Sequence, residues 1–195
     1  HLNRPVLDEP DRLKFAGKAL TRLRALEGLV GDMLGFVRGH VQAREWVALP
    51  RLLADAEQIF APQAQAREIA LDWPSEPPQL ELYSDSKALL GAIVNLLENA
   101  LVFSPPNGRI RVSLMRNDTV LQLSVQDDGP GVAADVAQRI FDPFFTTRAD
   151  GTGLGLAIAR GVAEASAGEL TLQPSLRGAC FRLQLPYRPI VHTTD

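Results

Sequence analysis

Two glycine clusters, separated by an aromatic-rich segment, are the parts of this chain best suited to chemistry. The first is Asp127–Gly131 (Asp-Asp-Gly-Pro-Gly), and the second runs from Gly151 to Leu156. Glycine lets a backbone approach a ligand where a side chain would collide, so each cluster is suited to form one wall of a binding site. Phenylalanines gather between the clusters, from Ile140 to Thr147. This order predicts a ligand site closed by a lid.

The two clusters differ in the ligand group they suit. Asp127 ends a predicted strand, where a carboxylate can accept a hydrogen bond from the exocyclic amine of adenine; an ordinary Asp-Gly turn has the same sequence. The second cluster opens a predicted helix at Leu154, whose free N–H groups and dipole favour an anion. A single Gly-x-Gly-x-Gly run is weak evidence, so each cluster alone leaves its role open.

A polar stripe on a predicted helix provides the third chemical feature. Asn95 and Asn99 are one turn apart and share a helix face with Glu98. Asparagine is a poor residue for a helix interior, so two of them beside an acid require an explanation. They either bond to nearby loops or offer a carbonyl oxygen to Mg²⁺, a cation that takes few protein oxygens together with phosphates and water.

Several familiar sites are excluded by spacing. A P-loop needs Lys-Ser or Lys-Thr after its last glycine, where Leu156-Ala157 stands. A dinucleotide fingerprint needs a glycine three residues after Gly153 and an apolar strand before it, and Thr146–Asp150 is polar. The three histidines and the single cysteine have no zinc-type spacing, and no Gly-x-Ser-x-Gly is present.

Composition bounds the class of protein. The 195 residues are 46% hydrophobic, which fits a globular chain. The formal net charge of −3 argues against nucleic acid as the main partner. A lone cysteine, Cys180, fits a reducing compartment. No apolar run approaches the ~20 residues of a membrane span, and no signal peptide opens the chain, so we expect a cytoplasmic location without membrane contact for this stretch. The start at His1 suggests a fragment, whose parent could be soluble or anchored.

These groups must be positioned by an α+β fold in which helices and strands alternate from about residue 45. We predict strands at 46–49, 68–73, 80–83, 109–115, 120–126, 170–173 and 180–185. We predict helices at 50–65, 85–103 (N-capped by Asp85), 133–140 and 154–167. Because most strands arrive in hairpins, we expect a two-layer sandwich: a mixed sheet with helices on one face.

A long helix precedes this domain. Acids and a proline at Asp8–Asp11 begin it, and an apolar stripe then recurs at spacings of three and four up to about Arg38. Such a stripe needs a partner. The helix could dock on its own domain, but we favour one arm of an antiparallel hairpin that dimerises into a four-helix bundle. The predicted domains are therefore 1–44, a partial hairpin; 45–188, the globular domain; and 189–195, a tail.

Taken in order, the motifs resemble those of sensor histidine kinases, over about residues 45–186. Asn95–Ala100 is similar to their N box, Asp127–Val132 to the G1 box, Phe141–Thr147 to the F box and Gly151–Leu156 to the G2 box. The closing segment Gly178–Pro186 also fits. The helix before the domain is similar to the second helix of the dimerisation and phosphotransfer hairpin. The resemblance implies a Bergerat ATP-binding fold.

The resemblance implies a role for each matching residue. Asn99 coordinates Mg²⁺, Asn95 lines the phosphate side, and both form the catalytic group with Glu98. Asp127 binds the adenine amine, and Phe144 and Phe145 pack the lid onto the body. The implied nucleotide-binding residues are Asn95, Asn99, Asp127, Gly129, Gly131, Val132, Phe145, Thr146, Thr147, Arg148, Gly151, Thr152, Gly153, Leu154, Gly155, Leu156 and Cys180.

The family transfers the γ-phosphate of ATP to a histidine in the hairpin and then to an aspartate of a response regulator. The implied cofactors are ATP and Mg²⁺, and the implied partners are a receiver domain and a second copy of the hairpin. Here Val102 stands where the N box often has a basic residue, and Arg148 could replace that phosphate contact. His1 lacks the acid that follows the family's acceptor histidine, so we expect the acceptor to be absent. A nucleotide-binding scaffold without turnover, and another ATPase of the gyrase and heat-shock superfamily, stay open as alternatives.

Overall fold

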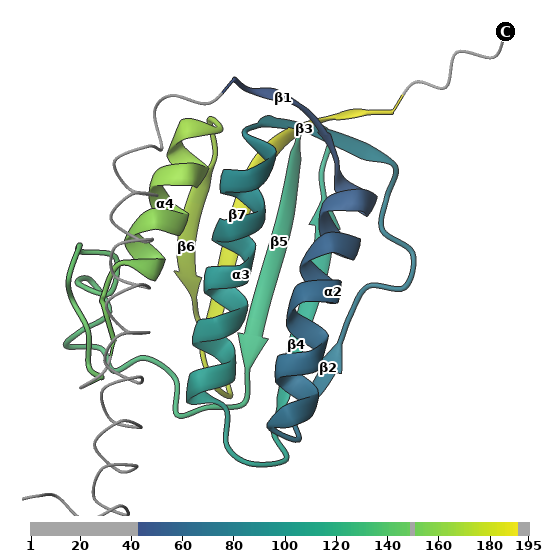
Figure 1. Ribbon diagram of the computed structural model, residues 1–195. Coiled ribbons are helices and arrows are strands. Elements are labelled where there is room, and N and C mark those ends of the chain that lie inside the picture. Colours follow the sequence, from purple (N-terminus) through teal and green to yellow (C-terminus); the bar gives the residue numbers. More distant parts are fainter. Residues whose placement is uncertain (1–42, 149–150, 191–195) are drawn as a thin grey trace, which may run out of the picture.

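The computed structural model describes residues 43–148 and 151–190, which form a sheet covered by helices (Figure 1). The predicted helix and all but two residues of the predicted domain 1–44 lie outside the described residues, as does most of the predicted tail. In chain order the elements are β1 (Glu45–Ala48), α2 (Leu49–Ala66), β2 (Ala70–Asp72), β3 (Leu80–Ser84), α3 (Ser86–Phe103), β4 (Arg109–Arg116), β5 (Val120–Asp127), α4 (Gly155–Ala165), β6 (Glu169–Gln173) and β7 (Cys180–Pro189).

The described strands form one mixed sheet, as predicted. Six of its seven strands follow the order β1-β3-β7-β5-β4-β2, and β6 pairs with β7. The pairing of β2 with β4 is parallel, while β5 pairs antiparallel with both β4 and β7. In the last ladder Gln126 lies opposite Cys180. The end of β5, where Asp127 stands, is thereby fixed beside the start of β7.

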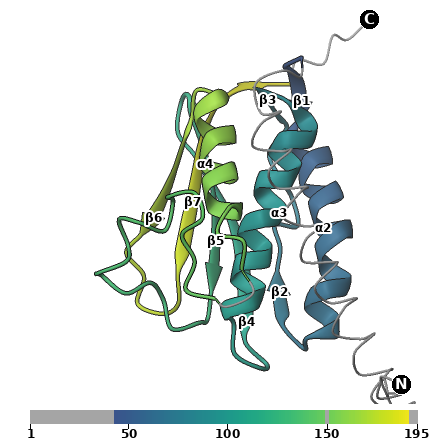
Figure 2. The ribbon, with the colours of Figure 1, turned by 60° about the vertical axis from the view of Figure 1, so that its left-hand side comes forward.

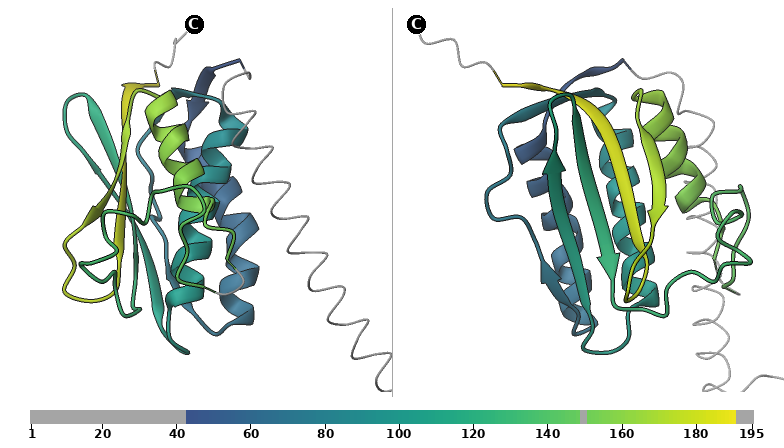
Figure 3. Two further views of the ribbon diagram at one scale, coloured as in Figure 1. Left: turned by 90° about the vertical axis from the view of Figure 1, so that its left-hand side faces the viewer. Right: turned by 180° about the vertical axis from the view of Figure 1, so that it is seen from behind.

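The three described helices cover one face of the sheet, which confirms the two-layer prediction (Figure 2). The other face is left open (Figure 3). Strand β5 shows the reason, because its residues alternate between buried and half-buried from Leu121 to Asp127. Apolar side chains therefore point toward the helices, and polar ones such as Gln122 and Ser124 point away.

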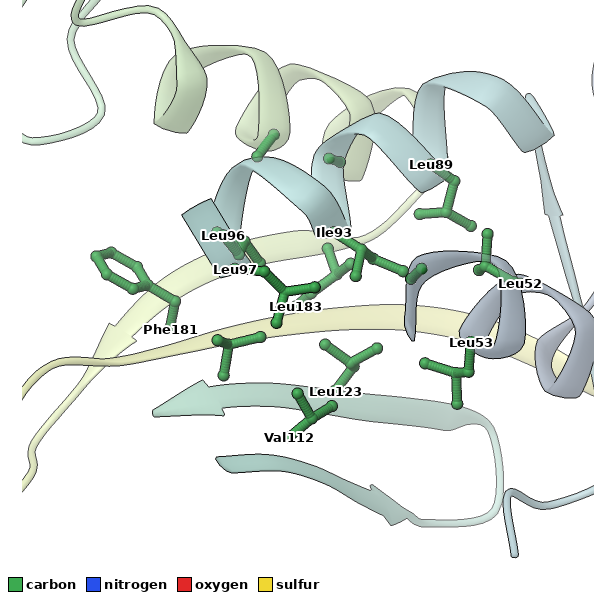
Figure 4. Packing of buried hydrophobic residues seen from close by; sticks show 14 of the residues in the cluster. Leu52, Leu53, Leu89, Ile93, Leu96, Leu97, Val112, Leu123, Phe181 and Leu183 are labelled. Carbon is green, nitrogen blue, oxygen red and sulfur yellow. The ribbon is translucent and has the colours of Figure 1, made fainter. Parts of the chain in front are cut away.

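Helix α3 lies at the centre of the core. Its buried side chains include Leu89, Ile93, Leu96 and Leu97, and Figure 4 shows them packed against Leu52 and Leu53 of α2 and the sheet residues Val112, Leu123, Phe181 and Leu183. Asp85 caps the helix as predicted, since its Oδ1 accepts hydrogen bonds from the amides of Lys87 and Ala88 at 2.9 and 3.0 Å. Ser86–Phe103 has the length and mean hydropathy (1.4) of a membrane span, a property it shares with core helices of this kind.

Two predicted elements differ clearly from the structure. Residues 133–140 form a series of turns instead of a helix, with isolated bonds such as Ala137 N–H to the Ala133 carbonyl at 3.1 Å. So short a segment gains few cooperative hydrogen bonds, and its apolar residues Val136 and Ile140 are drawn into the core instead. Strand β7 extends to Pro189, beyond the predicted end at Leu185, because its last residues pair with β3.

Candidate nucleotide-binding site

A pocket of about 560 Å³ lies between α3, the start of α4 and the segment that connects β5 to α4. The predicted residues among its lining are Asn95, Glu98, Asn99, Asp127, Gly131, Val132, Phe145, Thr146, Thr147, Arg148, Gly151, Thr152, Gly153, Gly155 and Leu156. They come from four separate stretches of sequence. The structure therefore brings the polar face of α3 and both glycine clusters to one cavity.

Asp127 is a buried carboxylate on the pocket wall, with 3% of its surface exposed. Its Oδ1 accepts two backbone hydrogen bonds, from Gly129 N–H at 2.8 Å and Ala179 N–H at 3.1 Å. Burial raises the pKa of Asp127 above 3.8, while these two bonds oppose that rise and the nearby charge of Asp128 adds to it. With Oδ1 held by the protein, Oδ2 is the oxygen left to accept a donor from a ligand.

The turn between β6 and β7 forms the support of this carboxylate, and sequence reasoning gave it no role. Gly178 has φ +66°, and a Cβ there would collide with the backbone carbonyl of Asp127. Only glycine permits both the conformation and the approach. The Ala179 amide then reaches Oδ1, and the Ala179 carbonyl accepts from the Asp127 amide at 3.0 Å. A glycine two residues before a predicted strand was the available signal.

The polar face of α3 forms the opposite wall. Asn95 donates from Nδ2 to the carbonyl of Gly155 at 3.3 Å, which ties α3 to the first residue of α4. Asn99 lines the pocket, and its side chain makes no hydrogen bond within residues 43–148 and 151–190. Glu98 lines the same wall as an exposed residue. The prediction that Asn95, Glu98 and Asn99 share one face of the helix is therefore confirmed.

The segment before α4 is held by backbone contacts around Gly153. This glycine has φ +68°, and an added Cβ would lie 2.5 Å from the carbonyl carbon of Phe144. Its carbonyl also accepts from Phe144 N–H at 2.9 Å. Phe145 is packed against the core, and the Arg139 guanidinium lies 4.5 Å from its ring centroid. The expectation for Phe144 was wrong: its side chain is 62% exposed, because its φ of 67° turns it away from the body.

Three predicted binding residues do not line the pocket. Cys180 begins β7 on the open face of the sheet, because strand residues alternate and its neighbour Phe181 points to the pocket side. Burial there raises the pKa of its thiol. Leu154 is buried in the protein with 1% exposed. Gly129 contributes its amide to Asp127 instead of a pocket surface.

Several apolar residues complete the pocket and were absent from the prediction. They are Phe103, Pro130, Ala133, Val136, Ile140, Ala179 and Phe181. Phe103 is the last residue of α3, and its ring is 40% exposed. An exposed aromatic residue beside a buried acceptor is suited to contact a planar base. The spacing of four residues from Asn99 to Phe103 was the sequence signal, since both lie on one helix face.

A mixed sheet with helices on one face and an acidic glycine turn facing a glycine-rich helix start define the class of nucleotide-binding ATPase. The family profile described as "Histidine kinase-, DNA gyrase B-, and HSP90-like ATPase" matches residues 84–189, which include α3, both glycine clusters and α4. The chain therefore belongs to that family.

Its relatives are sensor kinases. The chain is 38% identical over 190 residues to sensor protein kinase FleS of Pseudomonas aeruginosa, covering 97% of this chain and 47% of the relative. It is 33% identical to sensor histidine kinase ZraS of Escherichia coli over 83% of this chain and 35% of that one. The chain thus spans between about a third and a half of these curated relatives.

Solved structures of histidine kinases have the same fold. A mycobacterial sensor histidine kinase, MprB, superposes with a TM-score of 0.67 at 28% identity over 76% of this chain and 100% of that one. Full-length ShkA in complex with AMPPNP gives 0.76 at 26% identity, over 97% of this chain and 41% of that one. The ThkA complex with the response regulator protein TrrA gives 0.78 at 25% identity, over 94% and 54%.

Proposed function

We propose that this chain is the ATP-binding catalytic core of a sensor histidine kinase, and that the pocket holds ATP with adenine at Asp127 and phosphates at the start of α4. The observation that carries the proposal is the buried Asp127 carboxylate, whose Oδ1 is fixed by two amides so that Oδ2 can accept from the adenine amine. Phe103 and Ile140 supply apolar surface for the base.

The phosphate end follows from α4. Its first turn has no side-chain cap, and Gly153, Gly155 and Leu156 line the pocket, so free N–H groups can meet an anion. Arg148 and Thr146 to Thr147 lie along the same wall. Phosphoryl transfer asks a protein mainly for positioning and charge stabilisation, which these groups can supply.

The donor set also fits Mg²⁺. Within residues 43–148 and 151–190 no group of three His, Cys, Asp or Glu side chains is suited to hold a metal. Mg²⁺ typically takes one or two protein oxygens and completes its shell with phosphates and water, so the amide oxygen of Asn99 is a sufficient anchor. Asn95 and Glu98 would then border the transferred phosphate. When bound, the cation would neutralise phosphate charge.

The whole protein is proposed to use this core in phosphorelay. A receiver domain is the proposed partner, since ThkA was solved with a response regulator. We also propose that the chain divides at about residue 45 into a hairpin and a catalytic domain, that the hairpin of residues 1–44 dimerises, and that the catalytic domain is cytoplasmic. The relation to sensor kinases supports these proposals. A scaffold without turnover is the second candidate, favoured by Val102, which is absent from the pocket lining.

Calorimetric titration with a non-hydrolysable ATP analogue tests the site. Asp127→Asn should weaken binding about 10- to 100-fold, because a charge-assisted hydrogen bond to the amine is lost. Asn99→Ala should reduce the gain in affinity on adding Mg²⁺. Asp118→Asn, in the exposed turn between β4 and β5, is the matched control and should bind normally. A folded wild-type chain that binds no nucleotide would refute the proposal.

A further inference from the structure

The last two residues of β5 and the residue that follows it all bind the turn between β6 and β7, here called the support turn (residues 174–179). Gln126 donates from Nε2 to Ser175 Oγ at 3.0 Å and to the Arg177 carbonyl at 3.1 Å. Asp127 bonds to the Ala179 amide. Asp128 forms an ion pair with Arg177, in which Asp128 Oδ2 lies 3.2 Å from a guanidinium nitrogen of Arg177.

The contacts within the turn point the same way. Ser175 Oγ donates to the Arg177 carbonyl at 2.6 Å and accepts from the Arg177 amide at 3.3 Å. These bonds fix the turn directly before Gly178, whose backbone lies against Asp127. These bonds therefore fix the position of the Ala179 amide, which in turn orients the Asp127 carboxylate.

We infer that the support turn, through Gln126 and Arg177, positions Asp127 and so determines how strongly the site discriminates nucleotides by their 6-amino group. Gln126 and Arg177 are positioning residues, since they reach the base only through Asp127. The inference rests on the proposed function, in which Asp127 reads adenine. It adds a specificity role for surface residues outside the pocket lining.

The surface location makes the role separable from folding. The hydrogen bonds of Gln126 to the support turn are solvent-exposed, and the Arg177 side chain of the ion pair with Asp128 is 67% exposed. These interactions therefore contribute little to the stability of the fold. Their loss should instead allow the carboxylate to rotate. Rotation weakens a hydrogen bond to the amine but leaves the binding of phosphate and the apolar faces of the base unchanged.

The experiment compares ATP with purine riboside triphosphate, which lacks the 6-amino group, by calorimetric or fluorescence titration. In the wild-type chain the ratio of the two affinities should be about 10- to 100-fold in favour of ATP. Gln126→Ala and Arg177→Ala, alone and together, should lower that ratio, by about 3- to 10-fold in the double variant. Arg177→Lys keeps the charge opposite Asp128 and should retain the ratio.

Gln122→Ala is the matched control. Gln122 lies on the same face of β5 and bonds to Gln184 Oε1 at 3.0 Å, away from the support turn, so the ratio should stay at the wild-type value. A wild-type preference that persists in Gln126→Ala and Arg177→Ala would overturn the inference and leave the proposed function intact. A wild-type ratio near one would overturn both, because Asp127 would then not read the amine.

Discussion

At the scale of single residues, Asp127 combines two opposing demands. Burial disfavours its charge, while two amide donors favour it, and the balance raises its pKa above 3.8. A carboxylate held in this way costs stability when it is ionised and has no ligand. A ligand that donates a hydrogen bond to the carboxylate offsets this cost, so the buried acceptor favours the bound state.

The raised pKa predicts how stability depends on pH. Because the folded state holds the Asp127 proton to higher pH than the unfolded state does, the unfolding free energy should fall as pH rises from 3.8 to the folded pKa, and stay level above it. Asp127→Asn lacks this proton and keeps an oxygen for the two amides. Urea denaturation of both proteins across that interval should show the wild type losing stability relative to the variant.

The control for this titration is Asp118→Asn, which changes an exposed carboxylate in a turn. Its stability profile over the same range gives the effect of replacing a surface carboxylate. If the Asp127→Asn profile did not differ from that of this control, the Asp127 carboxylate would titrate alike in the folded and unfolded states, and burial would not control its charge.

The sequence predicted those residues whose role depends only on their neighbours in the chain, and missed those whose role depends on the fold. Asp127, Asn99 and the glycines that line the pocket were predicted to belong to the site because each lies in a short motif with its own chemistry. Gly178 was missed because its role depends on the backbone of β5, some fifty positions earlier in the chain. Cys180 was wrongly predicted to bind the nucleotide: the resemblance places it near the site, but the alternation of strand residues turns its side chain to the other face of the sheet.

At the scale of elements, α3 carries the site and the core at once. Its buried residues face the sheet, and Asn95, Glu98 and Asn99 face the pocket. The sequence predicted this helix and its cap because the apolar pattern is long and strong. It could not predict the turns at 133–140, where a short helical pattern competes with burial of Val136 and Ile140 against the core.

Glycines inside helices give a second prediction. A Cβ added at Gly91 of α3 or Gly161 of α4 would meet nothing within 4 Å. Gly91→Ala and Gly161→Ala should therefore each stabilise the domain by about 0.5–1 kcal/mol, through higher helix propensity and a less flexible unfolded chain. The measurement is the urea midpoint, with nucleotide affinity unchanged.

Gly178→Ala is the opposing control. Its φ of +66° and its contact with Asp127 predict a clear loss of stability, so three glycine-to-alanine changes should separate by sign. Equal effects at all three positions would show that helix propensity does not limit α3 and α4.

At the scale of the whole molecule, the layered arrangement separates functions by face. The face of the sheet that the helices cover holds the core and the pocket, and the other face is left open (Figure 3). The open face carries Gln126, whose side chain binds the support turn. The alternation of helices and strands predicted this arrangement. The contact between the ends of β5 and β7 could not be predicted, because it arises from the order of strands in the sheet.

The position of the histidines gives the last prediction. All three, His1, His40 and His192, lie outside residues 43–190, so the described domain contains no phosphoacceptor of its own. Incubated with γ-labelled ATP and Mg²⁺, the 195-residue chain should label an acceptor histidine on a separately supplied hairpin from a related kinase, and should not label itself. Asn99→Ala should abolish the transfer.

Each other outcome identifies a different protein. Stable label on His1 would show that the acceptor is within this chain. Nucleotide binding without transfer to any supplied hairpin would favour the scaffold, and restoring a basic residue by Val102→Lys would then be the direct test of why transfer fails. Steady hydrolysis of ATP without an acceptor would favour an ATPase of the gyrase or heat-shock type. In that case water would reach the γ-phosphate of the bound nucleotide. A kinase core, in contrast, must exclude water from the γ-phosphate until the acceptor histidine binds.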